Sequence, residues 1–354
     1  MLQKFNINNR VTLGHQWPPR TRVFEGLSRI IIYVQHGPFY ILTVYTLLLL
    51  LSPESLRLIK GPLASISIHQ VAVRYQKMAT ANANPPAQYF TALARNYGRQ
   101  TGNSTRASLA SIYGRIKPTI TSSSVVHDNA GGVGTATSVI LDNLAPTSWD
   151  DIPEVLITDN NPGMIAAAKE TFKDMSAKIT AIEADSQDLS TIPDGKFTHS
   201  ILNFSVFLFP DALGALREIY RTLQPDGVAV LLTWKRFGFG ATIHAAQSLV
   251  RPDLPPMPLP GSHFMNEGVL RDLVIKAGFS AATVQVEQDE TIRKDEDLEG
   301  MREFMLADFS KMATRGWTDE EIGRWPAAVD EAIKKEVEQY GGIQFEAWTV
   351  IAHK

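Results

Sequence analysis

The stretch SSVVHDNAGGVGTAT, residues 123–137, reads as a strand, a tight loop and the start of a helix. Small residues at Ala130, Gly131, Gly132 and Gly134 let a ligand approach the loop backbone, and the free N–H groups at the helix start can meet that ligand. Glycine loops also serve as plain turns. The position of this loop between a strand and a helix favours a ligand-binding loop.

Further strands follow this loop in alternation with helices, which predicts a parallel sheet with crossover helices. Residues 154–159 form an apolar strand that ends on Asp159, and further strands are expected at 179–184 and 197–204. A carboxylate at the end of the second strand can accept hydrogen bonds from both hydroxyls of a ribose, or it can cap the next helix. The carboxyl ends of these strands converge on one crevice, where open α/β sheets bind ligands.

The order of acid and glycines in residues 128–134, together with the helix, turn and strand over 213–234, resembles the class I S-adenosylmethionine-dependent methyltransferases. The resemblance covers about residues 85–354 and is greatest to small-molecule methyltransferases of fungal secondary metabolism and of the ubiquinone/menaquinone type. A nicotinamide-binding loop would place a third glycine near Thr137, so an oxidoreductase is disfavoured.

The resemblance implies S-adenosylmethionine as the cofactor and assigns the cofactor contacts by position. The implied cofactor-binding residues are Tyr97, Asp128, Ala130, Gly132, Gly134, Asp159, Asn160, Met164, Asp185, Ser186 and Asn203. In the family the first loop holds the methionine part, the acid after the second strand holds the ribose, and the pair after the third strand contacts adenine. Ala130 stands where the family usually has glycine, which would narrow the loop.

The resemblance also implies the architecture. We expect an α/β fold with a Rossmann-like, seven-stranded, mostly parallel sheet, an antiparallel C-terminal hairpin, helices on both faces and an N-terminal helical cap. The expected parts are the cap over 78–120 and the cofactor-binding core over 121–354. Five prolines between 252 and 260 predict a stiff lid at about 235–265 instead of a regular helix.

Methyl transfer mainly requires alignment of the acceptor atom, the methyl carbon and the leaving sulfur, so a base is optional. His244 and His263 follow the fifth strand, in the stretch that caps the substrate in the family, and are the candidate catalytic bases; both can equally be surface or packing residues. A helical stripe of Met301, Phe304, Met305, Phe309 and Met312 is either core or pocket wall.

The segment after the fourth strand reads Asn203-Phe204-Ser205-Val206, in contrast to the Asn-Pro-Pro-aromatic motif of methyltransferases that act on amide or amino nitrogens. No cluster with metal-ligand spacing supports a magnesium-dependent mechanism. Oxygen or carbon methylation of a small, largely apolar metabolite remains, with secondary-metabolite biosynthesis as the expected setting. The alternative is a methyltransferase-like regulatory protein that binds partners without turnover.

The amino-acid composition excludes several kinds of site and disfavours one class of partner. The chain has no cysteine, which excludes disulfides, thiolate zinc sites and a cysteine nucleophile. Residues 1–77 carry nine Lys and Arg against two Glu, and the remaining residues sum to −10, so nucleic acid is not an expected partner.

The N-terminal extension, residues 1–77, includes a largely apolar run over 30–51 that polar residues interrupt at 35–38. The run is long enough to span a membrane, so three interpretations stay open: a membrane anchor, a dispensable or non-native start before Met78, and a packed arm. We expect a cytoplasmic protein, with its catalytic body in the cytosol if the run is an anchor. The oligomeric state is not predicted.

Overall fold

The computed structural model describes residues 87–294, 296–307 and 311–354. The N-terminal extension and its apolar run at 30–51 lie outside these residues. Within them, no helix combines the length and the apolar character that crossing a membrane requires.

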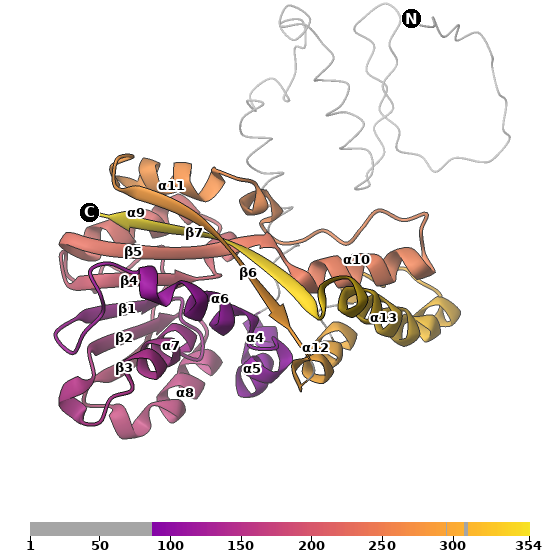
Figure 1. Ribbon diagram of the computed structural model, residues 1–354, viewed down its shortest axis with the longest axis horizontal. Coiled ribbons are helices and arrows are strands. Elements are labelled where there is room, and N and C mark those ends of the chain that lie inside the picture. Colours follow the sequence, from indigo (N-terminus) through magenta and orange to yellow (C-terminus); the bar gives the residue numbers. More distant parts are fainter. Residues whose placement is uncertain (1–86, 295, 308–310) are drawn as a thin grey trace, which may run out of the picture. The chain divides into compact units, whose positions relative to one another are not determined.

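A single seven-stranded sheet organises the described chain (Figure 1). Its strand order is β3-β2-β1-β4-β5-β7-β6. The strands are β1 Val125–Asn129, β2 Glu154–Asp159, β3 Ile179–Glu183, β4 Phe197–Asn203, β5 Leu223–Arg236, β6 Val284–Arg293 and β7 Ile343–His353. The first five strands are parallel, and β7 runs antiparallel to both β5 and β6. The predicted sheet and its antiparallel C-terminal pair are therefore confirmed.

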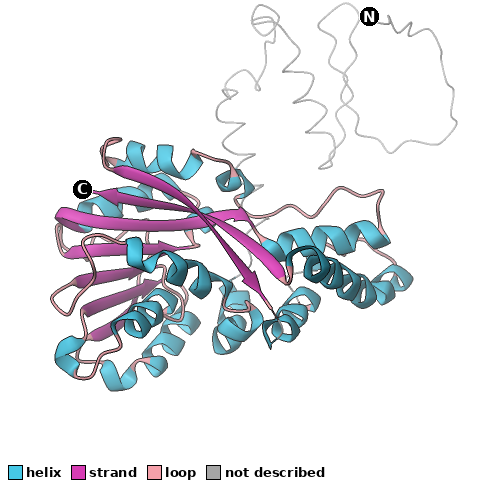
Figure 2. Cartoon of the chain, in the orientation of Figure 1, coloured by secondary structure: helices cyan, strands magenta, loops and turns pink. Residues whose placement is uncertain are grey.

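Both faces of the sheet are buried in its centre, which explains why a central strand such as β5 contains a continuous apolar run, whereas the edge strands β3 and β6 are partly exposed. In β5, Val228 and Val230 belong to one core, and Ala229 and Leu231 point into the other. Helices α7 Thr135–Leu144, α8 Pro162–Thr171, α10 Gly238–Val250, α12 Glu296–Leu306 and α13 Asp319–Tyr340 contribute to the first core. Helices α9 Ala212–Thr222 and α11 Val269–Ala277 contribute to the second, so helices cover both faces (Figure 2).

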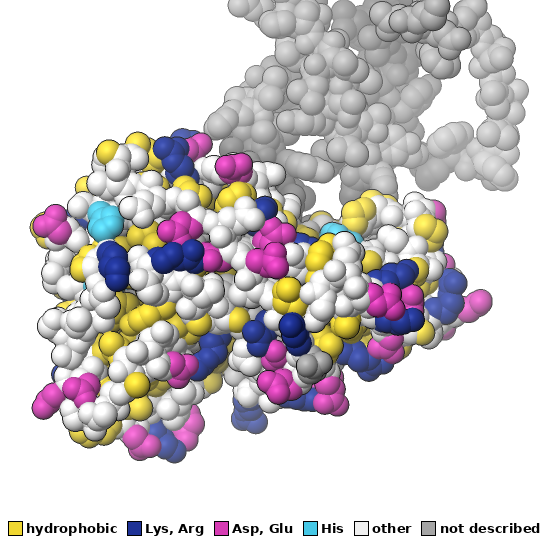
Figure 3. All heavy atoms as spheres, viewed as in Figure 1, with side chains coloured by type: hydrophobic (Ala, Val, Ile, Leu, Met, Phe, Trp, Pro, Cys, Tyr) yellow, Lys and Arg dark blue, Asp and Glu magenta, His cyan; other side chains and the backbone are white. Residues whose placement is uncertain are grey.

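The N-terminal cap consists of α4 Ala87–Leu93, α5 Tyr97–Gln100 and α6 Ser104–Ile112. Helix α4 packs against α8, and α5 packs against α12, so the cap connects the part of the fold around β2 and β3 with the C-terminal helices. On the face drawn in Figure 3, acidic and basic side chains are interspersed, and ion pairs such as Arg99–Glu303 and Arg302–Asp330 join the cap or α12 to their neighbours.

The expectation that the lid is not a regular helix is wrong for its first half. Residues 238–250 form the regular helix α10, because the five prolines all lie beyond its last residue and leave its backbone N–H groups free to bond. The prolines are confined to the irregular segment after Val250.

Candidate functional site

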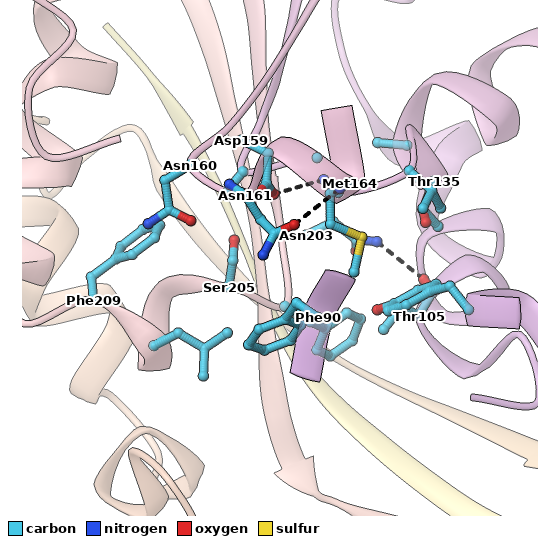
Figure 4. Close-up of a pocket in the computed structure, with 18 of the residues that line it drawn as sticks. Phe90, Thr105, Thr135, Asp159, Asn160, Asn161, Met164, Asn203, Ser205 and Phe209 are labelled. Carbon is cyan, nitrogen blue, oxygen red and sulfur yellow. Dashed lines mark hydrogen bonds between the residues drawn. The ribbon is translucent and has the colours of Figure 1, made fainter. Parts of the chain in front are cut away.

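A cavity of about 470 Å³ lies at the carboxyl ends of β1, β2 and β4, and we call it the main cavity (Figure 4). Residues from the glycine loop, the ends of the strands and the cap helices surround it. Its wall is formed by Phe90, Tyr97, Thr105, Ala130, Gly131, Gly132, Val133, Thr135, Ala136, Asp159, Asn160, Asn161, Met164, Asp185, Gln187, Asn203, Phe204, Ser205, Leu208, Phe209 and Pro210. Eight of the eleven residues implied as cofactor-binding lie in this wall.

The glycine loop turns through left-handed backbone conformations. Ala130, Gly132 and Gly134 have φ angles of 48°, 58° and 85°. The Gly131 N–H donates to the carbonyl of Thr158 at 2.9 Å, which fastens the loop to the end of β2. A Cβ on Gly132 would have only the Met164 sulfur, at 3.7 Å, within 4 Å among the described residues outside its chain neighbours. Gly132 therefore leaves room on the cavity side of the loop.

Asp159 is held rigidly at the end of β2. One carboxylate oxygen accepts the Gly132 N–H at 2.9 Å and the other accepts the Asn161 N–H at 2.9 Å. Burial raises the pKa of Asp159 above its ordinary value. The helix cap considered for Asp159 belongs to Asn161, whose side-chain oxygen accepts the N–H groups of Gly163 and Met164. The proline after Asn161 is a sequence signal for that cap.

The other three implied residues lie behind the loop instead of in the cavity wall. Asp128 is fully buried and accepts both the backbone N–H and the hydroxyl of Thr137, at 2.9 and 2.7 Å. Gly134 is packed against Phe172. Ser186 donates to the buried side-chain oxygen of Asn129 at 2.6 Å. Through these contacts the three residues hold the loops in place without facing the cavity.

Burial raises the pKa of Asp128 to about 6 from its ordinary 3.8. Between these two values the unfolded chain releases the proton while the native protein keeps it, so the contribution of Asp128 to stability falls as pH rises. Asp128→Asn keeps an oxygen for Thr137 and removes the titration. From about pH 4 to pH 7 this variant should gain about 2–3 kcal/mol of unfolding free energy relative to wild type. Urea unfolding at several pH values measures this difference; a pH-independent difference would contradict the prediction.

Two polar atoms in the main cavity have no hydrogen-bond partner among the described residues. They are the side-chain oxygens of Asn203 and Ser205, both buried. The amide of Asn203 donates to the Thr105 carbonyl at 3.3 Å, which fixes the direction of its side chain (Figure 4). Because a buried polar atom without a partner is costly, these two oxygens indicate a ligand with complementary polar groups.

Several residues of the wall escaped sequence reasoning. Thr105 comes from the cap and Thr135 from the start of α7, and a polar side chamber of about 140 Å³ beside them includes Arg106. Arg106 pairs with Asp142 on α7. Among the described residues that line this chamber, Arg106 carries the positive charge. No local motif marks these residues, because their role depends on how the cap docks on α7.

A second cavity of about 120 Å³ adjoins the main cavity and shares Phe90, Tyr97, Thr105, Phe204 and Leu208 with it. We call it the apolar cavity. Its remaining wall residues are Leu93, Thr101, Ser104, Phe207, Trp234, Phe237, Phe239, Leu259, Pro260, Met265 and Phe304. Of the predicted methionine and phenylalanine stripe, Phe304 reaches this wall, Met301 and Met305 are buried core, and Phe309 lies outside the described residues.

The structure brings neither candidate base to these cavities. The Nε2 of His244 lies 2.7 Å from the carbonyl oxygen of Met257. His263 is exposed, and its ring is tilted by 39° against that of Phe264, with ring centroids 4.3 Å apart. Neither ring contributes to a cavity wall, so their positions give no support to a catalytic role.

Comparison with known proteins adds independent findings. Residues 132–231 match a family model described as a methyltransferase domain. The chain is 26% identical over 234 residues to Methyltransferase tpcH of Aspergillus fumigatus, which covers 61% of this chain and 78% of that protein. It is 24% identical over 261 residues to Methyltransferase ktnA of Aspergillus niger. This alignment covers 65% of this chain and 84% of that protein. A demethylmenaquinone methyltransferase of Staphylococcus carnosus is 34% identical over 79 residues, 22% of this chain and 32% of that protein.

Proposed function

Since this chain is a class I S-adenosylmethionine-dependent methyltransferase, we propose that it methylates an oxygen or carbon atom of a small, largely apolar metabolite. The observation that carries the proposal is the apolar cavity, which adjoins the main cavity and shares five wall residues with it. Half of its wall residues are aromatic, and among the described residues the wall contains no Asp, Glu, Lys, Arg or His. The two Aspergillus relatives are named methyltransferases, which supports methyl transfer. An acceptor from secondary metabolism is the part of the proposal that comes from the resemblance of the sequence.

S-adenosylmethionine, when bound, supplies an activated methyl group. We propose that Asp159 binds the ribose hydroxyls, the loop at Ala130 and Gly132 accommodates the methionine part, and Asp185 contacts the adenine. The side chamber next to Tyr97 offers Arg106 for the carboxylate of the amino-acid part. With the cofactor bound, the unpaired side-chain oxygens of Asn203 and Ser205 would have a hydrogen-bond partner. The wall of the main cavity combines these polar groups with apolar side chains such as Met164 and Phe209, which fits a ligand with a polar ribose and amino-acid part and a flat adenine ring.

The acceptor is oriented by shape and kept from water by the aromatic wall. Trp234 stacks on Phe204 with ring centroids 3.7 Å apart, and Phe237 packs against Trp234 at 5.6 Å, so the wall is rigid. Tyr97 is the titratable residue common to both cavities, and burial raises the pKa of its phenol, so it stays protonated at neutral pH. The same burial would oppose ionisation of a phenol or enol inside the apolar cavity, so we propose that such an acceptor releases its proton to water as it is methylated.

The proposal is tested by incubating the full chain with S-adenosylmethionine and a panel of small phenols, enolic diketones and primary amines. We expect S-adenosylhomocysteine to accumulate with phenols or diketones and mass spectrometry to find one added methyl group on oxygen or carbon. Methylation confined to amines would contradict the acceptor assignment. Cofactor binding without any turnover across the panel would favour the regulatory alternative.

A further inference from the structure

The segment 251–265, which we call the strap, joins α10 to α11 without regular secondary structure over most of its length. It contains prolines at 252, 255, 256, 258 and 260. Proline has no backbone N–H, so the strap cannot hold its shape through a ladder of backbone hydrogen bonds. Backbone hydrogen bonds within the strap are confined to short turns, such as Leu254 N–H to the Arg251 carbonyl and Ser262 N–H to the Leu259 carbonyl, so its other backbone polar groups need partners from elsewhere.

Helix α10 supplies these partners through two side chains one turn apart. The amide of Gln247 donates to the carbonyl of Pro255 at 3.2 Å, and its oxygen accepts the N–H of Met257 at 2.9 Å. The Nε2 of His244 lies 2.7 Å from the carbonyl of Met257, and because a carbonyl only accepts, His244 is the donor. Gln247 is 5% exposed and Met257 is 3% exposed, so water does not compete strongly for these bonds.

The strap also forms one wall of the apolar cavity. Leu259, Pro260 and Met265 line it. The strap packs directly against Phe207, another wall residue, so closely that a Cβ on Gly261 would lie 2.5 Å from the Phe207 Cβ. A shift of the strap therefore changes the shape of this cavity.

The ends of the strap are fixed separately from its middle. Arg251 pairs with Asp253 and with Glu321, at 2.8 and 3.0 Å, and the Trp348 indole donates to the Met265 carbonyl at 2.9 Å. Between these points the bonds from His244 and Gln247 are the side-chain hydrogen bonds from α10 to the strap backbone.

We infer that His244 and Gln247 are positioning residues that set acceptor affinity and selectivity by holding the strap against the apolar cavity. This inference rests on the proposed function, because it assigns the apolar cavity to the acceptor. In this inference His244 donates a hydrogen bond to the Met257 carbonyl. The sequence had made His244 a candidate catalytic base, which would accept a proton. Neither residue lines the main cavity or the apolar cavity, so both act on acceptor binding indirectly, through the position of the strap.

The test compares full-chain wild type with Gln247→Ala and His244→Ala, using 2-naphthol, a fluorescent apolar phenol, as the probe. We expect each variant to bind 2-naphthol about tenfold more weakly, as the loss of one or two buried hydrogen bonds implies. Calorimetry should find the affinity for S-adenosylmethionine unchanged. Hydrogen exchange of the Met257 amide should become faster in Gln247→Ala.

Two further variants separate positioning from general stability. Ser248→Ala removes the hydroxyl that bonds the His244 carbonyl on the same helix and should leave 2-naphthol affinity unchanged. His244→Gln keeps a donor and should recover most of the binding lost in His244→Ala; this pair decides the matter if Gln247→Ala does not fold.

Unchanged 2-naphthol affinity despite faster exchange in the strap would overturn the inference, as would a wild-type protein that does not bind 2-naphthol. Failure of the wild type to bind S-adenosylmethionine would contradict the proposed function instead, so the two failures are distinguishable.

Discussion

Replacing Asp159 by alanine should weaken the binding of S-adenosylmethionine and S-adenosylhomocysteine at least about 100-fold, the loss expected for two hydrogen bonds to a charged group. The carboxylate is well placed for this role, because backbone N–H groups of Gly132 and Asn161 hold its two oxygens in a fixed direction at the rim of the main cavity. The same change releases the glycine loop, since Gly132 loses its partner. Isothermal calorimetry measures both affinities.

Glu183 provides the matched control for this prediction. It pairs in register with Asp159 across β2 and β3, ends its strand with a carboxylate of the same charge and is exposed outside the cavity wall. Glu183→Ala should therefore leave both affinities unchanged. Asp159→Asn, which retains an acceptor oxygen but no charge, should fall between wild type and Asp159→Ala. Equal affinity in wild type and Asp159→Ala would place the ribose elsewhere.

Much of the sheet could be predicted because its central strands are buried on both faces and its strands read as short, largely apolar runs between turns. The runs 154–159 and 179–184 match β2 and β3 to within one residue. Much of the wall of the main cavity was also predictable, because Ala130 and Gly132 lie just after β1 and Asp159 ends β2, and neighbouring parallel strands bring these positions to one rim.

The rest of the site depends on contacts between segments far apart in the sequence. Thr105 and Arg106 reach the cavities only because α6 packs on α7. Asp128 matches the family motif by position, yet its side chain points to Thr137 behind the loop. A motif gives the order of residues along the chain, and it does not say which of them face the ligand and which hold the loop.

The glycines of the loop allow that distinction to be tested directly. Gly132 and Gly134 both have positive φ angles, so alanine at either position carries a backbone cost of about 1–2 kcal/mol. Their surroundings differ. A Cβ on Gly134 would lie 2.4 Å from Phe172 and 3.1 Å from Ile157, both buried, whereas a Cβ on Gly132 would approach only the cavity-lining Met164, at 3.7 Å.

Gly134→Ala should therefore lose about 2–5 kcal/mol of unfolding free energy, the sum of backbone strain and overpacking. Gly132→Ala should lose only the strain, while its methyl group takes up space that the cofactor needs and weakens S-adenosylmethionine binding at least about tenfold, or 1.4 kcal/mol. Urea unfolding and calorimetry on the same samples separate the two effects.

The Phe172→Ala exchange adds a compensation test. In the double variant Gly134→Ala/Phe172→Ala the clashing ring is absent, so the combined loss of stability should be smaller than the sum of the two single losses. Gly132→Ala has no such partner ring, and its binding defect should persist in a Phe172→Ala background. If Gly132→Ala bound the cofactor as tightly as wild type, this part of the loop would not face the methionine part, and its positive φ would serve the turn alone.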